Sequence, residues 1–296
     1  MKLLVTGASG LYGSKLTELA VKKGHQVYSL YSQHQPLHGI PIKTDVSERE
    51  KLLSKFHELK PDAVVHAATL TDVDKCELNK KLAWKVNVEG TDNVADAAKT
   101  CGAFLLYIST DYVFDGEKGC YEETDLPSPM SYYAYTKLKA EEHVQDILNQ
   151  YCIARPSVIY GANSAAGKVN FALWLLEKLR KKEQAKVFAD QWNSPTLNMS
   201  LAEMTLEVLE RKLTGIFHLS GATRISRLNF AVLLAKTFGM DSSIFVASSI
   251  KDFSLPAKRP RDSSLNTSKA ERTLKNRPLK IESALERLKR EVETSS

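Results

Sequence analysis

Three glycines near the start of the chain restrict its fold more than any other feature. Gly7, Gly10 and Gly13 are spaced as GxxGxxG, directly after an apolar stretch at residues 2–6 and ahead of a helical pattern. This spacing allows a tight turn and a close approach of the backbone to a diphosphate, which the helix N-terminus can bind. The sequence therefore predicts a dinucleotide site here. Its expected contacts are Gly7, Ser9, Gly10, Leu11, Tyr12 and Gly13.

Short apolar stretches alternate with amphipathic helical patterns through the first half of the chain. This alternation predicts an α/β fold with a Rossmann-type, doubly wound parallel sheet. One helix is expected to begin with a capping box of Ser47 and Glu50 and to end before Pro61. The predicted strands are residues 2–6, 26–30, 63–66, 104–109 and 152–160.

The alternation becomes looser after residue 160. We therefore expect an NAD(P)-binding Rossmann domain at residues 1–160 and, at residues 161–296, mainly a smaller C-terminal substrate lobe, some segments of which can return to the sheet. A cleft between the two parts would bind the ligands. The expected elements are helices at 169–182, 200–213 and 226–238 and strands at 186–189 and 215–220.

The composition excludes several classes of protein. The chain has a net charge of +6, but its lysines and arginines alternate with acidic residues instead of forming one tract, so no nucleic-acid partner is expected. No apolar run is long enough for a signal peptide or a membrane span. The 4 cysteines lack paired spacing, which favours reduced thiols in the cytoplasm and no metal site.

The end of the second predicted strand bears on the choice of cofactor. An acidic residue there would bind the ribose of NAD, but the chain has Tyr31 and Ser32, whose hydroxyls suit a 2′-phosphate. NADP(H) is therefore preferred, and NAD(H) stays open. Asp45 is expected either to contact the adenine or to cap the helix at Ser47.

Tyr133 and Lys137 are the candidate catalytic pair. They lie four residues apart in a predicted helix at 131–148, so both side chains share one face. An ammonium group beside a phenol lowers the pKa of the phenol from about 10, which would make Tyr133 an effective acid near neutral pH. Thr110 follows a predicted strand, where its hydroxyl would face the same crevice.

These motifs resemble the extended short-chain dehydrogenase/reductase superfamily, and within it the dTDP-4-dehydrorhamnose reductase family most closely. The similarity extends over nearly the whole chain. It rests on the glycine loop, the Tyr133/Lys137 pair, Val65-His66-Ala67-Ala68, Val73-Asp74-Lys75, Asn87-Val88-Glu89-Gly90-Thr91, Ser109-Thr110-Asp111-Tyr112-Val113-Phe114, Arg259-Pro260 and Leu265-Asn266-Thr267.

The resemblance implies NADPH-dependent reduction of the C4 keto group of a dTDP-4-keto-6-deoxy sugar. Tyr133 would protonate the oxygen, Thr110 would hydrogen-bond it, and Lys137 would bind the nicotinamide ribose and keep Tyr133 acidic. A homodimer is also expected, and residues 190–196 and 258–261 resemble parts of the family's substrate lobe. The remaining implied cofactor contacts are Val46, Ala67, Ala68, Thr69 and Asn87, with Tyr133 and Lys137.

The chain departs from the family pattern at three places, one of which is the cofactor-selecting loop, where the usual charged markers are missing. Two other activities stay open. Pro156, Ser157 and Val158 stand where the family usually has Thr-Ser-Trp, and Tyr135 stands where a small or polar residue is commoner. A nucleotide-sugar epimerase or dehydratase shares most of the motifs, although Tyr112 stands where a dehydratase has Glu. The regulatory subunit of methionine adenosyltransferase, a binding protein, resembles the same reductases.

Overall fold

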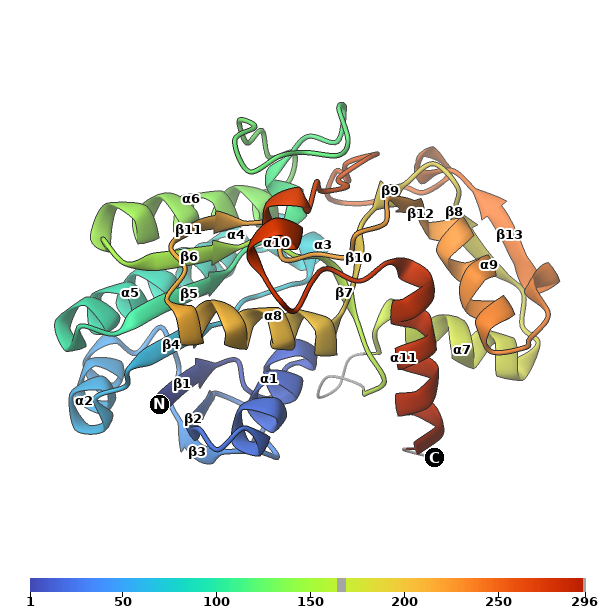
Figure 1. Ribbon diagram of the computed structural model, residues 1–296. Helices are drawn as coiled ribbons and strands as arrows, with labels where there is room; N and C mark the ends of the chain where they lie inside the picture. Colours follow the sequence, from blue (N-terminus) through green and yellow to red (C-terminus); the bar gives the residue numbers. More distant parts are fainter. Residues whose placement is uncertain (164–168, 295–296) are drawn as a thin grey trace.

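A seven-stranded parallel sheet forms the centre of the computed structural model, which describes residues 1–163 and 169–294 (Figure 1). The strand order is β11-β6-β5-β4-β1-β2-β3. This is the expected doubly wound arrangement, with the chain crossing over between β3 and β4. The strands are β1 (Lys2–Thr6), β2 (Gln26–Tyr31), β3 (Ile40–Lys43), β4 (Ala63–His66), β5 (Phe104–Ile108), β6 (Tyr151–Ala154) and β11 (Gly215–Phe217).

Helices cover both faces of the sheet because the strand side chains that point to each face are apolar. Leu3 and Val5 pack in one core cluster with α1 and α8, whereas Leu4 packs in a second cluster with α2, α5 and α6. Both clusters are fully buried, as expected for a sheet covered on two sides. These helices are α1 (Leu11–Lys22), α2 (Arg49–Leu59), α5 (Gly90–Cys101), α6 (Tyr132–Ile147) and α8 (Asn198–Arg211).

The predicted strand at residues 152–160 was wrong, because the chain bends at Arg155 and Pro156 into two separate strands. β6 stays in the main sheet, while β7 (Ser157–Tyr160) leaves it and pairs with β10 (Pro195–Leu197). Because Pro156 has no N–H to donate to a neighbouring strand, it interrupts the ladder of hydrogen bonds at the point between β6 and β7. β7 thus leads the chain out of the sheet towards the second lobe.

Segments from beyond residue 160 return to the sheet. β11 pairs with β6 at one edge, and α8 packs along α1 on one face. The domain boundary at residue 160 stays a prediction, but the described core is continuous across it. The structure places α8 two residues before its predicted start, and β11 is shorter than predicted.

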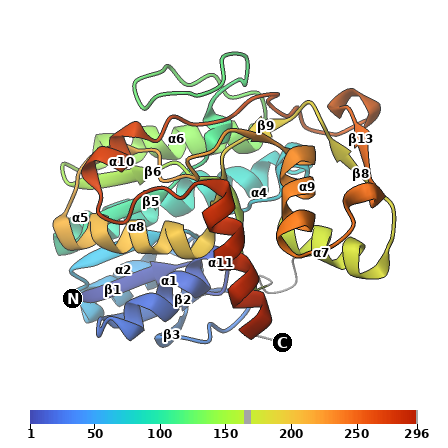
Figure 2. The same ribbon diagram turned by 45° about the vertical axis from the view of Figure 1, so that its right-hand side comes forward.

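The second lobe lies beside the C-terminal ends of the sheet strands (Figure 1). The last helix runs between the helices of the sheet and this lobe, as both views show (Figure 2). The remaining elements are α3 (Val73–Leu78), α4 (Lys80–Trp84), the π-helical turn Lys85–Glu89, α7 (Phe171–Lys181), β8 (Ala185–Phe188), β9 (Trp192–Asn193), β12 (Ile225–Ser226), α9 (Arg227–Thr237), β13 (Phe245–Ser248), α10 (Ser268–Thr273), α11 (Ile281–Thr294) and 3₁₀ turns at Asp111–Val113, Ser242–Ile244 and Ile250–Asp252. Within the described ranges, none of these helices has the length and apolar character needed to cross a membrane.

Candidate active site

A cavity of about 850 Å³ lies at the C-terminal ends of the sheet strands, between the sheet and the second lobe. Most of the residues that the sequence nominated line its wall. Asn87 and Lys137 do not, and both are buried behind it. The nominated residues in the wall are Gly7, Ser9, Gly10, Leu11, Tyr12, Gly13, Tyr31, Ser32, Asp45, Val46, Ala67, Ala68, Thr69, Thr110 and Tyr133.

The glycine loop turns where a side chain could not be accommodated. Gly7 has a φ of +68°, and a Cβ there would lie 2.8 Å from backbone atoms of Ala67 and Ala68. A Cβ on Gly13 would lie 2.2 Å from the carbonyl oxygen of Gly7. The N-terminus of α1 has no side-chain cap, so the N–H groups of its first turn face the cavity without a competing acceptor. These features fit the diphosphate of a dinucleotide.

Asp45 lines the cavity, and its expected contact with the adenine stays a prediction. Its Oδ1 accepts a hydrogen bond from the Ser47 N–H at 2.9 Å. The predicted capping box of Ser47 and Glu50 was wrong, because α2 begins at Arg49 after Glu48, whose side chain makes no capping bond. The Asp45 turn replaces the box and satisfies a backbone donor before the helix.

Asn87 supports the cavity wall from behind. Its Oδ1 accepts hydrogen bonds from the Thr69 hydroxyl at 2.8 Å and from the Leu70 N–H at 2.7 Å. Its Nδ2 donates to the Thr136 hydroxyl at 3.0 Å. Asn87 therefore connects the wall segment at Thr69 to helix α6, which carries Tyr133.

Tyr133 and Thr110 meet at the inner end of the cavity. Tyr133 lies in the first turn of α6, which Ser131 caps, and its hydroxyl is close to that of Thr110. Thr110 lies just after β5 and caps the 3₁₀ turn that follows, where it accepts a bond from the Tyr112 N–H at 3.2 Å. A substrate oxygen in this part of the cavity would therefore be near two hydroxyl groups.

Lys137 lies one turn beyond Tyr133 and is buried. Its Nζ donates to the carbonyl oxygen of Ile108 at 2.7 Å and lies 4.2 Å from the centre of the Tyr107 ring. Burial lowers the pKa of Lys137 to about 7. Burial also raises the pKa of Tyr133, although the neighbouring Thr110 hydroxyl acts in the opposite direction. The effect of Lys137 on the acidity of Tyr133 stays a prediction, in which a cationic nicotinamide would add to the charge of Lys137.

The second lobe contributes a cation that the sequence analysis missed. Arg227, at the start of α9, lines the cavity and lies 4.7 Å from the centre of the Phe171 ring. Its Nε donates to Gln191 at 3.2 Å, and Gln191 donates to the Tyr112 hydroxyl at 3.4 Å. No sequence pattern marks Arg227, because its position depends on how the lobe packs against the sheet.

The basic segment at residues 258–261 is placed differently from what the resemblance implies. The Arg259 guanidinium forms an ion pair with Asp74 at 2.8 Å, and none of the segment's residues lines the cavity as described. Two of the quoted motifs therefore bind each other. Arg227, not Arg259, presents its guanidinium to the cavity.

Val158 occupies the place of the family's usual tryptophan and lines the cavity. It has a φ of +35°, which is unusual for a β-branched residue. The pairing of β7 with β10 skips Val158, so it is the extra residue of a β-bulge. A bulge turns a side chain away from its regular direction, which here brings Val158 to the cavity wall.

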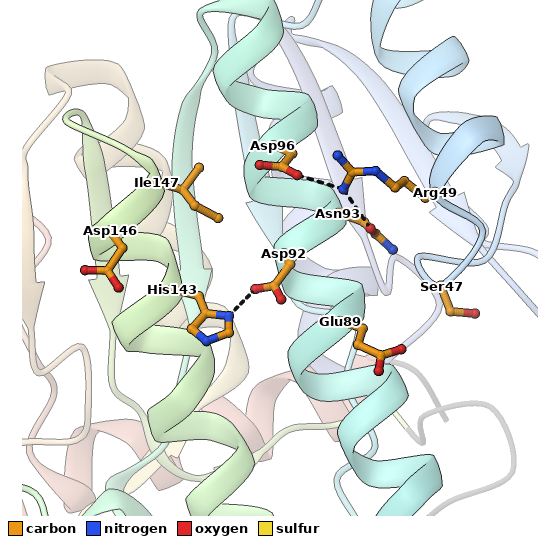
Figure 3. Close-up of a pocket in the computed structure, with 9 residues that line it drawn as sticks. All are labelled: Ser47, Arg49, Glu89, Asp92, Asn93, Asp96, His143, Asp146 and Ile147. Atoms are coloured by element: carbon orange, nitrogen blue, oxygen red, sulfur yellow. Dashed lines mark hydrogen bonds and ion pairs between the residues drawn. The ribbon is translucent and has the colours of Figure 1, made fainter.

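A second hollow, of about 640 Å³, lies between α5, α6 and the start of α2 (Figure 3). Two of its carboxylates are already paired. Asp92 accepts from His143 Nδ1 at 2.6 Å, and Asp96 binds Arg49 at 2.7 Å. Among the residues that the structure places, no group of three or more metal-ligating side chains is found. Of the nominated catalytic residues, Thr110 and Tyr133 line the first cavity and Lys137 lies buried behind its wall.

Comparisons with known proteins agree with this geometry. A family model described as RmlD substrate binding domain matches residues 1–294. A probable low-salt glycan biosynthesis reductase of Haloferax volcanii is 33% identical over 274 residues, which cover 92% of this chain and 91% of the relative.

Two solved structures are similar over almost the whole chain. The crystal structure of a dTDP-4-dehydrorhamnose reductase from Clostridium acetobutylicum has a TM-score of 0.89 and 32% identity, covering 99% of this chain and 100% of that one. The reductase of that name from Bacillus anthracis, solved in complex with NADP, also has a TM-score of 0.89, with 28% identity and coverage of 98% and 99%.

Proposed function

Because the chain belongs to the RmlD substrate binding domain family, we propose that it catalyses the NADPH-dependent reduction of the C4 keto group of a dTDP-4-keto-6-deoxy sugar, in nucleotide-sugar biosynthesis. The observation that carries the proposal is that a dinucleotide loop and the hydroxyls of Thr110 and Tyr133 line one cavity. Reduction of a ketone needs both a hydride donor and a proton donor at the same place.

In this reaction Tyr133 gives a proton to the oxygen at C4, and Thr110 holds that oxygen by a hydrogen bond. Both hydroxyls lie at the inner end of the cavity, away from bulk water. Lys137 would bind the nicotinamide ribose, and ribose hydroxyls around its amino group would favour the charged form over the neutral form that burial favours. This charge then favours the ionised form of Tyr133 that remains after proton transfer.

The reduced nicotinamide supplies the hydride when the cofactor is bound. The fit of Gly7 and Gly13 to a diphosphate supports a dinucleotide, and Tyr31 and Ser32 offer hydroxyls to a 2′-phosphate. The NADP complex of the Bacillus anthracis relative supports NADP(H) as the preferred cofactor, with NAD(H) as a second choice. Asp45 and Val46, which line the cavity, would contact the adenosine half.

At the substrate end, Arg227 binds the diphosphate of the nucleotide sugar. None of the described carboxylates lies within ion-pair distance of its guanidinium. An arginine held over an aromatic ring and directed into a cavity suits the paired oxygens of a phosphate. Val158, smaller than the family's tryptophan, leaves more room around the sugar.

The first test is NADPH oxidation with dTDP-4-keto-6-deoxy sugar, for wild type and Tyr133→Phe. We expect turnover by the wild type and a fall in kcat of about 10²- to 10⁴-fold for Tyr133→Phe, because the proton donor is lost. Tyr135→Phe is the matched control, since Tyr135 lies exposed on the same helix. Replacing NADPH by NADH in the same assay measures the cofactor preference.

No NADPH oxidation despite cofactor binding would contradict the proposal. An epimerase would interconvert sugars without net cofactor consumption, and a regulatory subunit would bind the cofactor and an adenosyltransferase without turnover. The named relatives support the reductase over both.

We also propose that the protein acts as a homodimer in the cytoplasm. The resemblance to the superfamily supports the dimer, and the four free cysteines suit a reducing compartment. Light scattering during gel filtration measures the mass in solution, and cell fractionation measures the location.

A further inference from the structure

Asp111, directly after Thr110, is buried with only 2% of its surface exposed. Its carboxylate accepts hydrogen bonds from three hydroxyl groups. Ser157 and Ser263 donate to Oδ2 at 2.7 and 2.6 Å, and Thr110 donates to Oδ1 at 3.1 Å. A buried carboxylate needs such donors, because an unsatisfied charge away from water is costly.

The three donors come from distant parts of the chain. Thr110 belongs to the loop after β5, Ser157 begins β7, and Ser263 lies in the segment that follows the basic residues of the second lobe. The Ser157 hydroxyl also accepts from the Ser194 N–H at 3.3 Å. One carboxylate therefore joins the sheet, the chain that leaves it and the returning C-terminal segment.

These bonds decide which way the Thr110 hydroxyl faces. In the absence of substrate the Thr110 hydroxyl donates to Asp111, and its oxygen accepts from the Tyr112 N–H, which together hold this hydroxyl beside Tyr133. A threonine free to rotate would be held less closely beside Tyr133. Small errors in such positions lower the rate strongly.

We propose that Asp111 is a positioning residue, which fixes Thr110 against Tyr133 and makes this alignment depend on Ser263 of the C-terminal segment. Given the proposed reductase activity, on which this inference rests, the substrate lobe orients the hydroxyl of Thr110 through hydrogen bonds. Docking of the segment around Ser263 is then required for catalysis as well as for folding.

The test is Ser263→Ala, which removes one donor and adds no bulk. We expect kcat to fall about tenfold, as for a lost hydrogen bond to a charged group, with the KM for NADPH unchanged. In a Thr110→Val background the same substitution should lower kcat by less than about twofold, since residues in one network are not additive.

Ser264→Ala is the matched control. Ser264 is also fully buried and donates to an aspartate, Asp262, at 2.6 Å, but it does not contact Asp111. We expect Ser264→Ala to change the thermal stability about as much as Ser263→Ala does and to leave kcat unchanged. An equal fall in kcat for both serines, or a full effect of Ser263→Ala in the Thr110→Val background, would overturn the proposal.

A crystal structure of Ser263→Ala separates this proposal from the proposed function. We expect the Asp111 carboxylate to rotate and the Thr110 hydroxyl to leave its bond of 3.1 Å. An unchanged Thr110 would overturn the positioning role whatever the activity. A wild type without reductase activity would instead overturn only the proposed function.

Discussion

At this site, burial affects the ionisation of single side chains more than neighbouring charges do. Tyr133 and Lys137 are both removed from water, and each is pushed towards its neutral form. The same holds for His66 behind the dinucleotide loop. A bound cofactor would bring hydroxyls and a charged ring to these groups, so the protein is adapted to work with the cofactor in place.

The pH dependence of folding provides a test at this scale. Burial, and then the charge of Lys137, lower the pKa of His66 to about 3, while its ring is bonded to Thr6 at 2.7 Å and Thr91 at 3.0 Å. In the unfolded chain a histidine takes up a proton below about pH 6.5. Stability from neutral His66 is therefore complete above this pH and is lost as the pH falls towards 3.

We expect His66→Gln to show a shallower fall in unfolding free energy below pH 6.5 than the wild type, by up to about 1.4 kcal/mol per pH unit. Urea unfolding at a series of pH values measures the slopes. The exposed His34→Gln is the matched control. Parallel slopes for wild type and His66→Gln would contradict a buried neutral His66.

At the scale of elements, helix α6 is fixed by an ion pair at its centre. Glu141 accepts two hydrogen bonds from Arg155, at 2.9 and 2.5 Å, and both side chains are almost fully buried. Arg155 lies at the bend between β6 and β7. The pair therefore ties the helix that carries Tyr133 to the point where the chain leaves the sheet.

Removing one partner of this pair leaves a buried charge. We expect Glu141→Gln and Arg155→Met each to lower the unfolding free energy by about 3–5 kcal/mol, measured by urea unfolding. Lys139→Ala, which breaks a partly exposed pair with Glu142 on the same helix, should cost less than about 1 kcal/mol. If all three variants lower the unfolding free energy by the same small amount, water reaches the site of Arg155.

Most elements of the sheet could be predicted because their signals are local. Glycine spacing, apolar strands and the capping serine of α6 are all present in short stretches of sequence. The break at Pro156 was missed since both strands are apolar and read as one. Arg227 and the Ser263 contact could not be found, because they depend on packing between segments far apart in the chain.

At the scale of the whole molecule, the chain does not divide cleanly at residue 160. A protein ending there would lack α8 and β11, and would expose the apolar face on which α8 packs, which includes Leu16 of α1. We expect residues 1–160 alone to aggregate or unfold without a cooperative transition, as followed by circular dichroism during heating. Cooperative unfolding with NADPH binding would instead establish an independent domain at residues 1–160.

The late return of β11 also affects how the protein is made. β6 ends at Ala154 and its edge partner β11 begins at Gly215, so about 60 residues must be translated before the sheet is complete. At about 5–20 residues per second this takes roughly 3–12 s, during which a nascent chain presents an open strand edge and an apolar surface. Ribosome-bound chaperones that cover such surfaces would meet this protein during that interval.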